Sequence, residues 1–390
     1  MGLRQREADS EFARQALAEK RLTRSQLHEC AGAQMGLQDR GIRRALPVLV
    51  YGLGILERPL IEQLVRHVLR RAGPLQLGGF CITRQIGRGG MGVVYKGRQT
   101  SLDREVAVKL LLRRDMSDEF VQRFRQEGQI AAHLRHNNLV TVIEIGEEEG
   151  WHFIAMEYVA GPTLAQRVTK HGPLDEIEAL DMTAKVASAL QHAHERGTIH
   201  RDVKPGNIMF TRSGEPKLCD LGLARHRNID ESDMIARGVT LGSRRYMAPE
   251  QVRGLNNVDH RVDIYSLGLT LYFALTGKPP FKEVSKDRVM YEHLRGHLHW
   301  PAGEGARVSD EVSWIVMRMA AAEPSERYDS AAHLVADLVN LRSELLRRGD
   351  RPPPQPVTLD DIDEESKEDS GESGPQEVPR EDAEQDAGEQ

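Results

Sequence analysis

Two short polar strings near the middle of this 390-residue chain leave few folds open to it. The first covers residues 200–207 and reads His-Arg-Asp-Val-Lys-Pro-Gly-Asn, and the second is Asp-Leu-Gly at residues 220–222. An aspartate can orient a hydroxyl group and accept its proton, and asparagine and aspartate oxygens are ligands that suit Mg²⁺. A lysine in the same string can stabilise negative charge. The order of these residues predicts a metal-dependent site for phosphoryl transfer from ATP.

A glycine-rich segment lies upstream, between two runs of β-forming residues. Residues 86–94 read Ile-Gly-Arg-Gly-Gly-Met-Gly-Val-Val and fit the pattern G-x-G-x-x-G-x-V. Glycine lets a backbone approach phosphates closely and aim its N–H groups at them. A dinucleotide-binding fold would begin a helix after such glycines, but Val93, Val94 and Tyr95 favour a strand. The segment therefore predicts a β-hairpin that covers a nucleotide.

The next apolar strand, residues 106–110, is interrupted by Lys109. This matches a pattern in which a lysine contacts the α and β phosphates of the nucleotide. A buried lysine needs a carboxylate partner, and Glu127 is the best-placed candidate, in a segment (119–134) with apolar residues at helical spacing. An isolated glutamate on a helix is more often a solvated charge. The order of the surrounding motifs favours the pairing with Lys109.

Together these motifs resemble those of the eukaryotic-type (Hanks-type) serine/threonine protein kinases, in a form similar to the bacterial members. The resemblance covers residues 80 to about 345 and implies an α+β fold with a β-rich N-lobe (80–158) and a helical C-lobe (159–345). Three more family landmarks follow in order: a hinge strand at 153–159, the end of the activation segment at 246–250 and a buried helix around 262–268.

The resemblance implies roles for individual residues. The expected catalytic residues are Asp202, Lys204 and Asn207, and the expected ligands of Mg²⁺ or Mn²⁺ are Asn207 and Asp220. The residues expected around ATP are Ile86, Gly87, Arg88, Gly89, Gly90, Met91, Gly92, Val94, Ala107, Lys109, Glu127, Met156, Glu157 and Val159. Those expected to brace the site are Arg201, Glu250, Asp263 and Arg327, of which Asp263 supports the catalytic loop and Arg327 pairs with Glu250.

The activation segment offers three hydroxyl groups for phosphorylation, ranked Thr240, Ser232 and then Ser243. In this family the residue at the position of Arg201 pairs with a phosphorylated activation segment, because a phosphate adds nearly two negative charges. The alternative is that Arg201 is satisfied without phosphate and the segment is always ordered. Ser243 stands where the family usually has threonine, and it keeps the hydroxyl group.

The position of Lys204, two residues after Asp202, is typical of serine/threonine kinases in this family, so serine and threonine acceptors are expected. Thr163 and Gly206 stand where arginine-directed relatives carry acidic residues, so strict selection of arginine is not expected. The protein substrate is not indicated. A pseudokinase scaffold is the alternative function, and the retained catalytic residues disfavour it. Residues 246–250 disfavour a small-molecule phosphotransferase.

Residues 1–72 are expected to form a helical module built from two units 33 residues apart. Leu17, Leu22, Leu27 and Glu29 would correspond to Val50, Ile55, Leu60 and Glu62, each unit being a helix, a turn and a second helix. Residues 23–26 have the form of a capping box. The pattern resembles helical repeats that precede type II secretion ATPases, some of which bind a cyclic dinucleotide, but their Arg-Leu-Gly start is absent. Docking of a regulatory partner, or simple packing, is favoured over ligand binding.

The end of the chain, residues 350–390, is predicted to be a disordered acidic tail. Residues 360–390 carry a formal charge of −12, in a chain whose net charge is −6, and few apolar residues. The acidic run is interpreted as solvating, in preference to a pseudosubstrate or an arm for a basic partner.

Three scattered cysteines, Cys30, Cys81 and Cys219, lack metal-ligand spacing and predict reduced thiols in the cytoplasm, as does the lack of a secretory leader. Cys219 precedes Asp220, and a buried inert thiol is favoured there over a reactive one in the nucleotide pocket. No apolar run reaches the roughly 18 residues that span a bilayer. No nucleic-acid partner is predicted.

Overall fold

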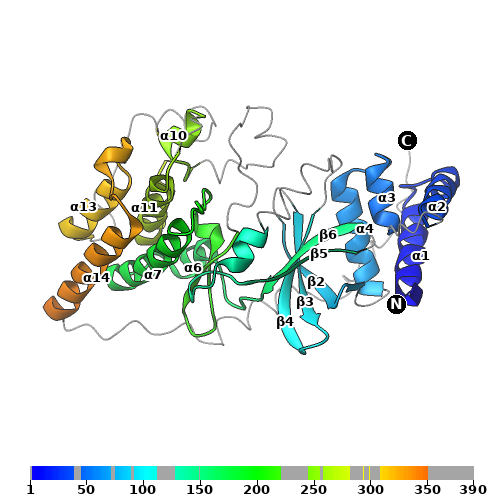
Figure 1. The fold of residues 1–390 in the computed structure, drawn as a ribbon, viewed down its shortest axis with the longest axis horizontal. Helices are drawn as coiled ribbons and strands as arrows, with labels where there is room; N and C mark the ends of the chain where they lie inside the picture. Colours follow the sequence, from blue (N-terminus) through cyan, green and yellow to red (C-terminus); the bar gives the residue numbers. More distant parts are fainter. Residues whose placement is uncertain are drawn as a thin grey trace, which may run out of the picture.

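The computed structural model describes residues 2–38, 45–71, 75–88, 92–111, 128–148, 150–220, 245–254, 258–281, 293, 298 and 308–349. These residues form a β-rich lobe and a helical lobe (Figure 1). Several predictions fall outside the described residues: Gly89, Gly90, Met91, Glu127, Ser232, Thr240, Ser243 and the tail at 350–390.

Within the described residues, a six-stranded antiparallel sheet forms the N-terminal lobe, in the order β1-β2-β3-β4-β6-β5. Its strands are β1 (Leu75–Leu77), β2 (Phe80–Arg88), β3 (Gly92–Gln99), β4 (Arg104–Leu111), β5 (Val142–Glu148) and β6 (Trp151–Glu157). The strands on either side of the glycine-rich turn, β2 and β3, pair antiparallel, with Gly87 opposite Val94 and Arg88 opposite Val93. The prediction of a strand after the glycines, in place of a helix, is confirmed.

The two faces of this sheet have different neighbours, because side chains alternate along a strand. On β4, Val106, Val108 and Leu110 belong to a hydrophobic cluster that includes the N-terminal helices. Ala107 and Leu111, on the same strand, belong to a second cluster on the opposite face. One face of the sheet is therefore covered by helices, and the other is the face that carries Lys109.

Residues 2–38 and 45–71 form four helices: α1 (Gly2–Ala18), α2 (Arg24–Gln38), α3 (Leu46–Gly52) and α4 (Arg58–Arg71). Figure 1 shows them together at one end of the molecule, with α4 next to the strands. Phe12 of α1 and Ile61 and Leu64 of α4 are buried in one cluster with Phe80 and Tyr95 of the sheet. The helices and the sheet thus share a core.

The predicted helix-turn-helix pairs are present, but their spacing is 34 residues and the predicted value of 33 is wrong. The second helices of the two pairs begin at positions 24 and 58, and the buried Cys30 and Leu64 occupy equivalent places. Glu29 is exposed and Glu62 is buried, so these two residues are not equivalent. The predicted repeat was aligned on residue type, and residue type alone does not show which apolar side chains face the core.

The predicted capping box at the start of α2 is confirmed. The Thr23 N–H donates to Oε1 of Gln26 over 2.9 Å, and the Gln26 N–H donates to the Thr23 hydroxyl oxygen over 3.2 Å. Each side chain satisfies a backbone donor that the helix itself leaves open.

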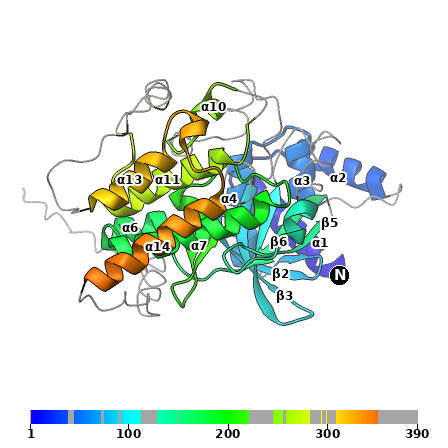
Figure 2. The same cartoon turned by 60° about the vertical axis from the view of Figure 1, so that its left-hand side comes forward.

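The helical lobe is built around the buried helix α11 (Arg261–Thr276). In the described part of this lobe the other α-helices are α6 (Leu164–His171), α7 (Glu176–His194), α10 (Pro249–Val252), α13 (Asp310–Met319) and α14 (Ala331–Arg348), with a two-stranded sheet of β7 (Ile208–Phe210) and β8 (Pro216–Leu218). A Cβ on Gly268 would lie 2.6 Å from the Met319 Cβ, so glycine permits the close approach of α11 and α13. Figure 2 shows α7 lying along α14, as their contacts require.

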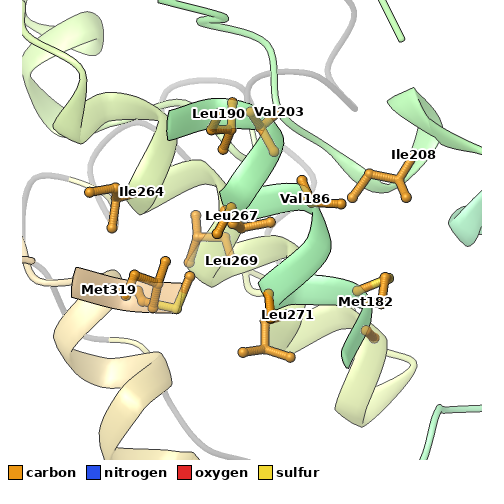
Figure 3. Packing of buried hydrophobic residues seen from close by; sticks show 14 of the residues in the cluster. Met182, Val186, Leu190, Val203, Ile208, Ile264, Leu267, Leu269, Leu271 and Met319 are labelled. Carbon is orange, nitrogen blue, oxygen red and sulfur yellow. The ribbon is translucent and has the colours of Figure 1, made fainter. Parts of the chain in front are cut away.

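The core of this lobe also holds the first polar string in place. Val203 and Ile208, inside and just after that string, are buried in one cluster with Leu190 of α7 and Leu267 of α11 (Figure 3). None of the helices in the described ranges is long and apolar enough to cross a membrane.

Candidate active site

The loop at residues 200–207 joins α7 to β7 and is fixed by a carboxylate from α11. Asp263 is fully buried and accepts hydrogen bonds from the backbone N–H groups of His200 (2.8 Å) and Arg201 (2.7 Å). Arg201 has φ +61°, in the left-handed region that residues other than glycine seldom adopt. The two hydrogen bonds stabilise this conformation, which leads the chain into Asp202.

His194 at the end of α7 completes the surroundings of Asp263. Its Nε2 lies 2.7 Å from Oδ2 of Asp263. Burial by itself would raise the pKa of Asp263, but the hydrogen bond and charge of His194, together with the hydrogen bond from the His200 N–H, outweigh it and hold the pKa below its usual range. Asp263 is therefore ionised at neutral pH and is a strong acceptor for the loop. His194 was not predicted, and its signal in the sequence is only a histidine six residues before His200.

The three predicted catalytic residues meet at one point. The Lys204 Nζ lies 2.7 Å from Oδ2 of Asp202. The amide nitrogen of Asn207 donates to the backbone oxygen of Asp202 over 2.8 Å and to its Oδ2 over 3.0 Å. The side chains of Asp202 and Lys204 are each 23% exposed. The carboxylate is thus oriented by two neighbours and still open to a group that arrives from solvent.

The two polar strings are tied together through Cys219, although twelve residues lie between Asn207 and Asp220. The β7–β8 hairpin turns the chain back, and the Cys219 N–H donates to the backbone oxygen of Asn207 over 2.8 Å. His200 Nε2 lies 3.0 Å from the backbone oxygen of Cys219. Burial lowers the pKa of His200, so the neutral ring is the donor. This hairpin brings Asp220 to the catalytic loop.

The predicted lysine of the N-terminal lobe reaches a carboxylate of the C-terminal lobe. Lys109 Nζ lies 2.6 Å from Oδ1 of Asp220. The charge of Lys109 lowers the pKa of Asp220, and the charge and hydrogen bond of Asp220 raise the pKa of Lys109 although burial acts to lower it. Both groups are therefore charged at neutral pH. The proposed partner Glu127 lies outside the described residues, and its neighbour Gly128 packs against Ile145 of β5.

The oxygen atoms that Asp220 and Asn207 offer fit a hard cation that is also bound by the phosphates of a substrate. Asp220 offers an ionised carboxylate, and the amide nitrogen of Asn207 is engaged with Asp202, which leaves its amide oxygen as the possible ligand atom. Mg²⁺ is usually bound by one or two carboxylates together with waters and substrate phosphates. The part of the chain that the structure describes contains no group of three or more His, Cys, Asp or Glu that could hold a metal without such help.

Beside these charges lies an apolar surface between the lobes. Ala107, Met156 and Val159 are buried in it, and Ile86 and Val94 of the hairpin pack against it. These are five of the residues predicted around ATP, and an apolar surface of this kind can take up a flat heterocycle.

Two residues of the other lobe, Met209 and Cys219, also pack on this apolar surface. Met209 was not predicted, and its signal is its place two residues after Asn207. Burial raises the pKa of the Cys219 thiol, which supports the inert interpretation of that residue.

The hinge between the lobes is attached to β8 through Glu157. Its Oε1 accepts a hydrogen bond from the Thr141 N–H over 2.7 Å and lies 2.8 Å from Nζ of Lys217. The Glu157 N–H also donates to the backbone oxygen of Thr141 over 2.9 Å, so the side chain and this N–H are both engaged within the fold. Lys217 was not predicted, and a lysine in a short strand gives no local signal of such a contact.

The predicted ion pair of the C-terminal lobe is present. Arg327 donates to both carboxylate oxygens of Glu250, over 2.6 and 2.9 Å. The arginine side chain is fully buried, and its Nε also donates to the backbone oxygen of Ala321 over 2.8 Å. This pair joins α10, which follows the activation segment, to the loop before α14.

The sequence model of the family described as protein kinase domain matches residues 80–339, which is more than half of the chain. The chain belongs to the protein kinase family. The predicted family and its two-lobed fold are thereby confirmed. Lys109 and Asp220 come from different lobes of this fold, and the loop at residues 200–207 lies beside them.

Curated relatives of this chain include bacterial serine/threonine-protein kinases. It is 39% identical over 305 residues to the serine/threonine-protein kinase PknB of Mycobacterium leprae, an alignment that covers 76% of this chain and 47% of that protein. It is 38% identical over 262 residues to the serine/threonine-protein kinase PrkC of Bacillus subtilis, covering 67% of this chain and 40% of that protein. The chain thus spans less than half the length of these relatives.

Proposed function

We propose that this chain transfers the γ-phosphoryl group of ATP to serine and threonine hydroxyl groups of proteins in a signalling pathway. The observation that carries the proposal is the meeting of two charged pairs, Asp202 with Lys204 and Asp220 with Lys109, beside an apolar surface. Phosphoryl transfer needs positioned groups and neutralised charge more than covalent chemistry. The relatives' names, serine/threonine-protein kinase, support the acceptor class.

Each group of the site has a role in this proposal. Asp202 orients the acceptor hydroxyl and takes its proton, and Lys204 stabilises the negative charge of the transferred group. Asn207 and Asp220 hold Mg²⁺ or Mn²⁺, which when bound with ATP neutralises charge on the phosphates. Lys109 anchors the α and β phosphates, with Glu127 as a second partner.

Further parts of the proposal concern regulation and organisation. The chain would phosphorylate its own activation segment, with Thr240 as the preferred site, followed by Ser232 and then Ser243. The added phosphate would be a partner for Arg201. The helical module (1–72) is a candidate docking site for a regulatory partner, attached to the kinase domain (80–345) and followed by the acidic tail (350–390). A cytoplasmic place of action rests on the three cysteines, which have no disulfide among them.

The acceptor class and the metal requirement can be tested together with the purified chain. Three matched peptides that differ only in serine, threonine or tyrosine at the acceptor position are incubated with γ-labelled ATP and Mg²⁺. We expect label on the serine and threonine peptides, background label on tyrosine, and loss of all label with excess EDTA. As the control for the chelator, Mg²⁺ or Mn²⁺ added in excess of the EDTA should restore label transfer to the peptides. Label on tyrosine alone, or transfer that survives EDTA, would contradict the proposal.

A further inference from the structure

One ion pair connects the N-terminal helices to the glycine-rich hairpin. Nε of Arg88, the last residue of β2, lies 3.0 Å from Oε2 of Glu62 on α4. The Glu62 side chain is 1% exposed, whereas the Arg88 side chain is 51% exposed. Arg88 pairs with Val93 across the hairpin, and three residues of sequence separate it from Gly92. The pair therefore lies at the base of the predicted phosphate-binding turn.

A buried glutamate is unexpected at this place on α4. Its neighbours Ile61, Leu64 and Val65 are buried in the core shared with the sheet, where Val93 of the hairpin is also fully buried. Burial of a carboxylate is unfavourable unless it is paired and hydrogen-bonded, and an apolar side chain would serve packing alone. The pairing with Arg88 gives a reason for the charge, because an ion pair fixes orientation and register more narrowly than apolar contact does.

We propose that Glu62 is a positioning residue for nucleotide binding, which holds Arg88 and with it the base of the glycine-rich hairpin. The proposal rests on the proposed function, in which this hairpin covers the phosphates of ATP. A hairpin strand whose end is already fixed by a contact loses less conformational freedom when the nucleotide binds. The N-terminal helices, which carry Glu62, are thereby linked to the affinity for ATP. A partner that shifts α4 would change this affinity through the same contact.

The test uses the full chain and four variants: Glu62→Gln, Arg88→Gln, their double mutant and Arg88→Lys. The measured quantities are KM for ATP, kcat, and the Kd of a non-hydrolysable ATP analogue with Mg²⁺ by calorimetry. We expect each glutamine variant to raise KM and Kd three- to tenfold with kcat changed by less than twofold. The double mutant should bind the ATP analogue no more weakly than the weaker-binding single variant, because the two substitutions remove the same contact. Arg88→Lys keeps the charge and should recover part of the affinity.

Arg98→Gln is the matched control, because Arg98 lies in the same sheet and pairs with the exposed Asp103 at the turn before β4. It should leave KM and Kd within twofold of the wild type. An unchanged Kd in folded Glu62→Gln protein, or effects that multiply in the double mutant, would overturn the proposal. If Glu62→Gln fails to fold, the Kd values of Arg88→Gln and Arg88→Lys decide it, since Arg88 is half-exposed. Calorimetry also separates the two proposals, because a wild type that binds the analogue but transfers no phosphate contradicts only the proposed function.

Discussion

Arg327→Met is expected to lower the free energy of unfolding of the C-terminal lobe by about 3–5 kcal/mol. Methionine fills much of the space of arginine but leaves the carboxylate of Glu250, a residue that is 6% exposed, without its counter-charge. The carbonyl groups of Ala321, Ala322 and Arg261 lose their donors at the same time. Removing one partner of a buried pair costs more than the pair contributes, because the other charge stays buried.

Urea unfolding followed by far-ultraviolet circular dichroism measures this loss. The control is Arg348→Met at the end of α14, where the arginine is 53% exposed and pairs with Glu311 and Glu344; its midpoint should not move measurably. Adding Glu250→Gln to Arg327→Met should recover part of the stability, because the remaining group is then neutral. Equal losses of unfolding free energy in Arg327→Met and Arg348→Met would show that the buried pair stabilises the lobe no more than an exposed pair does.

Removal of residues 1–72 is expected to yield an aggregated or self-associated kinase domain. The truncation would expose the sheet face that carries Phe80, Ile82, Val93 and Tyr95, all at most 1% exposed in the whole chain. Burial of each large apolar side chain contributes roughly 1.5–3 kcal/mol. A contiguous apolar face of this kind drives association in water.

Size-exclusion chromatography of residues 73–390 beside the full chain checks this result. A second truncation that removes residues 357–390 is the control. It should elute as a single species and melt at the temperature of the full chain, because a solvating acidic tail contributes little to the fold. A monomeric 73–390 fragment with an unchanged melting temperature would contradict the shared core and make the helical module an independent unit.

The sequence predicted best where chemistry fixes both residue type and order. Asp202, Lys204 and Asn207 lie in one eight-residue string, so their meeting needs only a local turn. The ion pair of Glu250 with Arg327 spans 77 residues, and it was predicted only through the family resemblance. The strands β2, β3 and β4 were predicted from runs of β-forming residues and β6 from the family resemblance, whereas β1 and β5 were not predicted.

Long-range geometry was beyond the reach of pattern alone. The contact of Lys109 with Asp220 spans 111 positions and joins two lobes, and nothing local indicates it. The repeat in the N-terminal helices was displaced by one residue, and one residue turns a helical side chain by about 100°. That single step paired the exposed Glu29 with the buried Glu62. The contact of Glu62 with Arg88 joins α4 to β2, and no local pattern indicates it.

The most direct test of the active site is a single-turnover transfer from γ-labelled ATP by the wild type and by Asp202→Ala, with the Kd of an ATP analogue measured in parallel. Asp202 contacts Lys204 and Asn207 but lies outside the apolar surface predicted to hold the base. We expect label on serine or threonine with the wild type, a rate lower by about 10²–10⁴-fold with Asp202→Ala, and a Kd within threefold. Equal transfer by both proteins would remove Asp202 from catalysis. A wild type that binds the analogue and transfers no label would make the chain a scaffold.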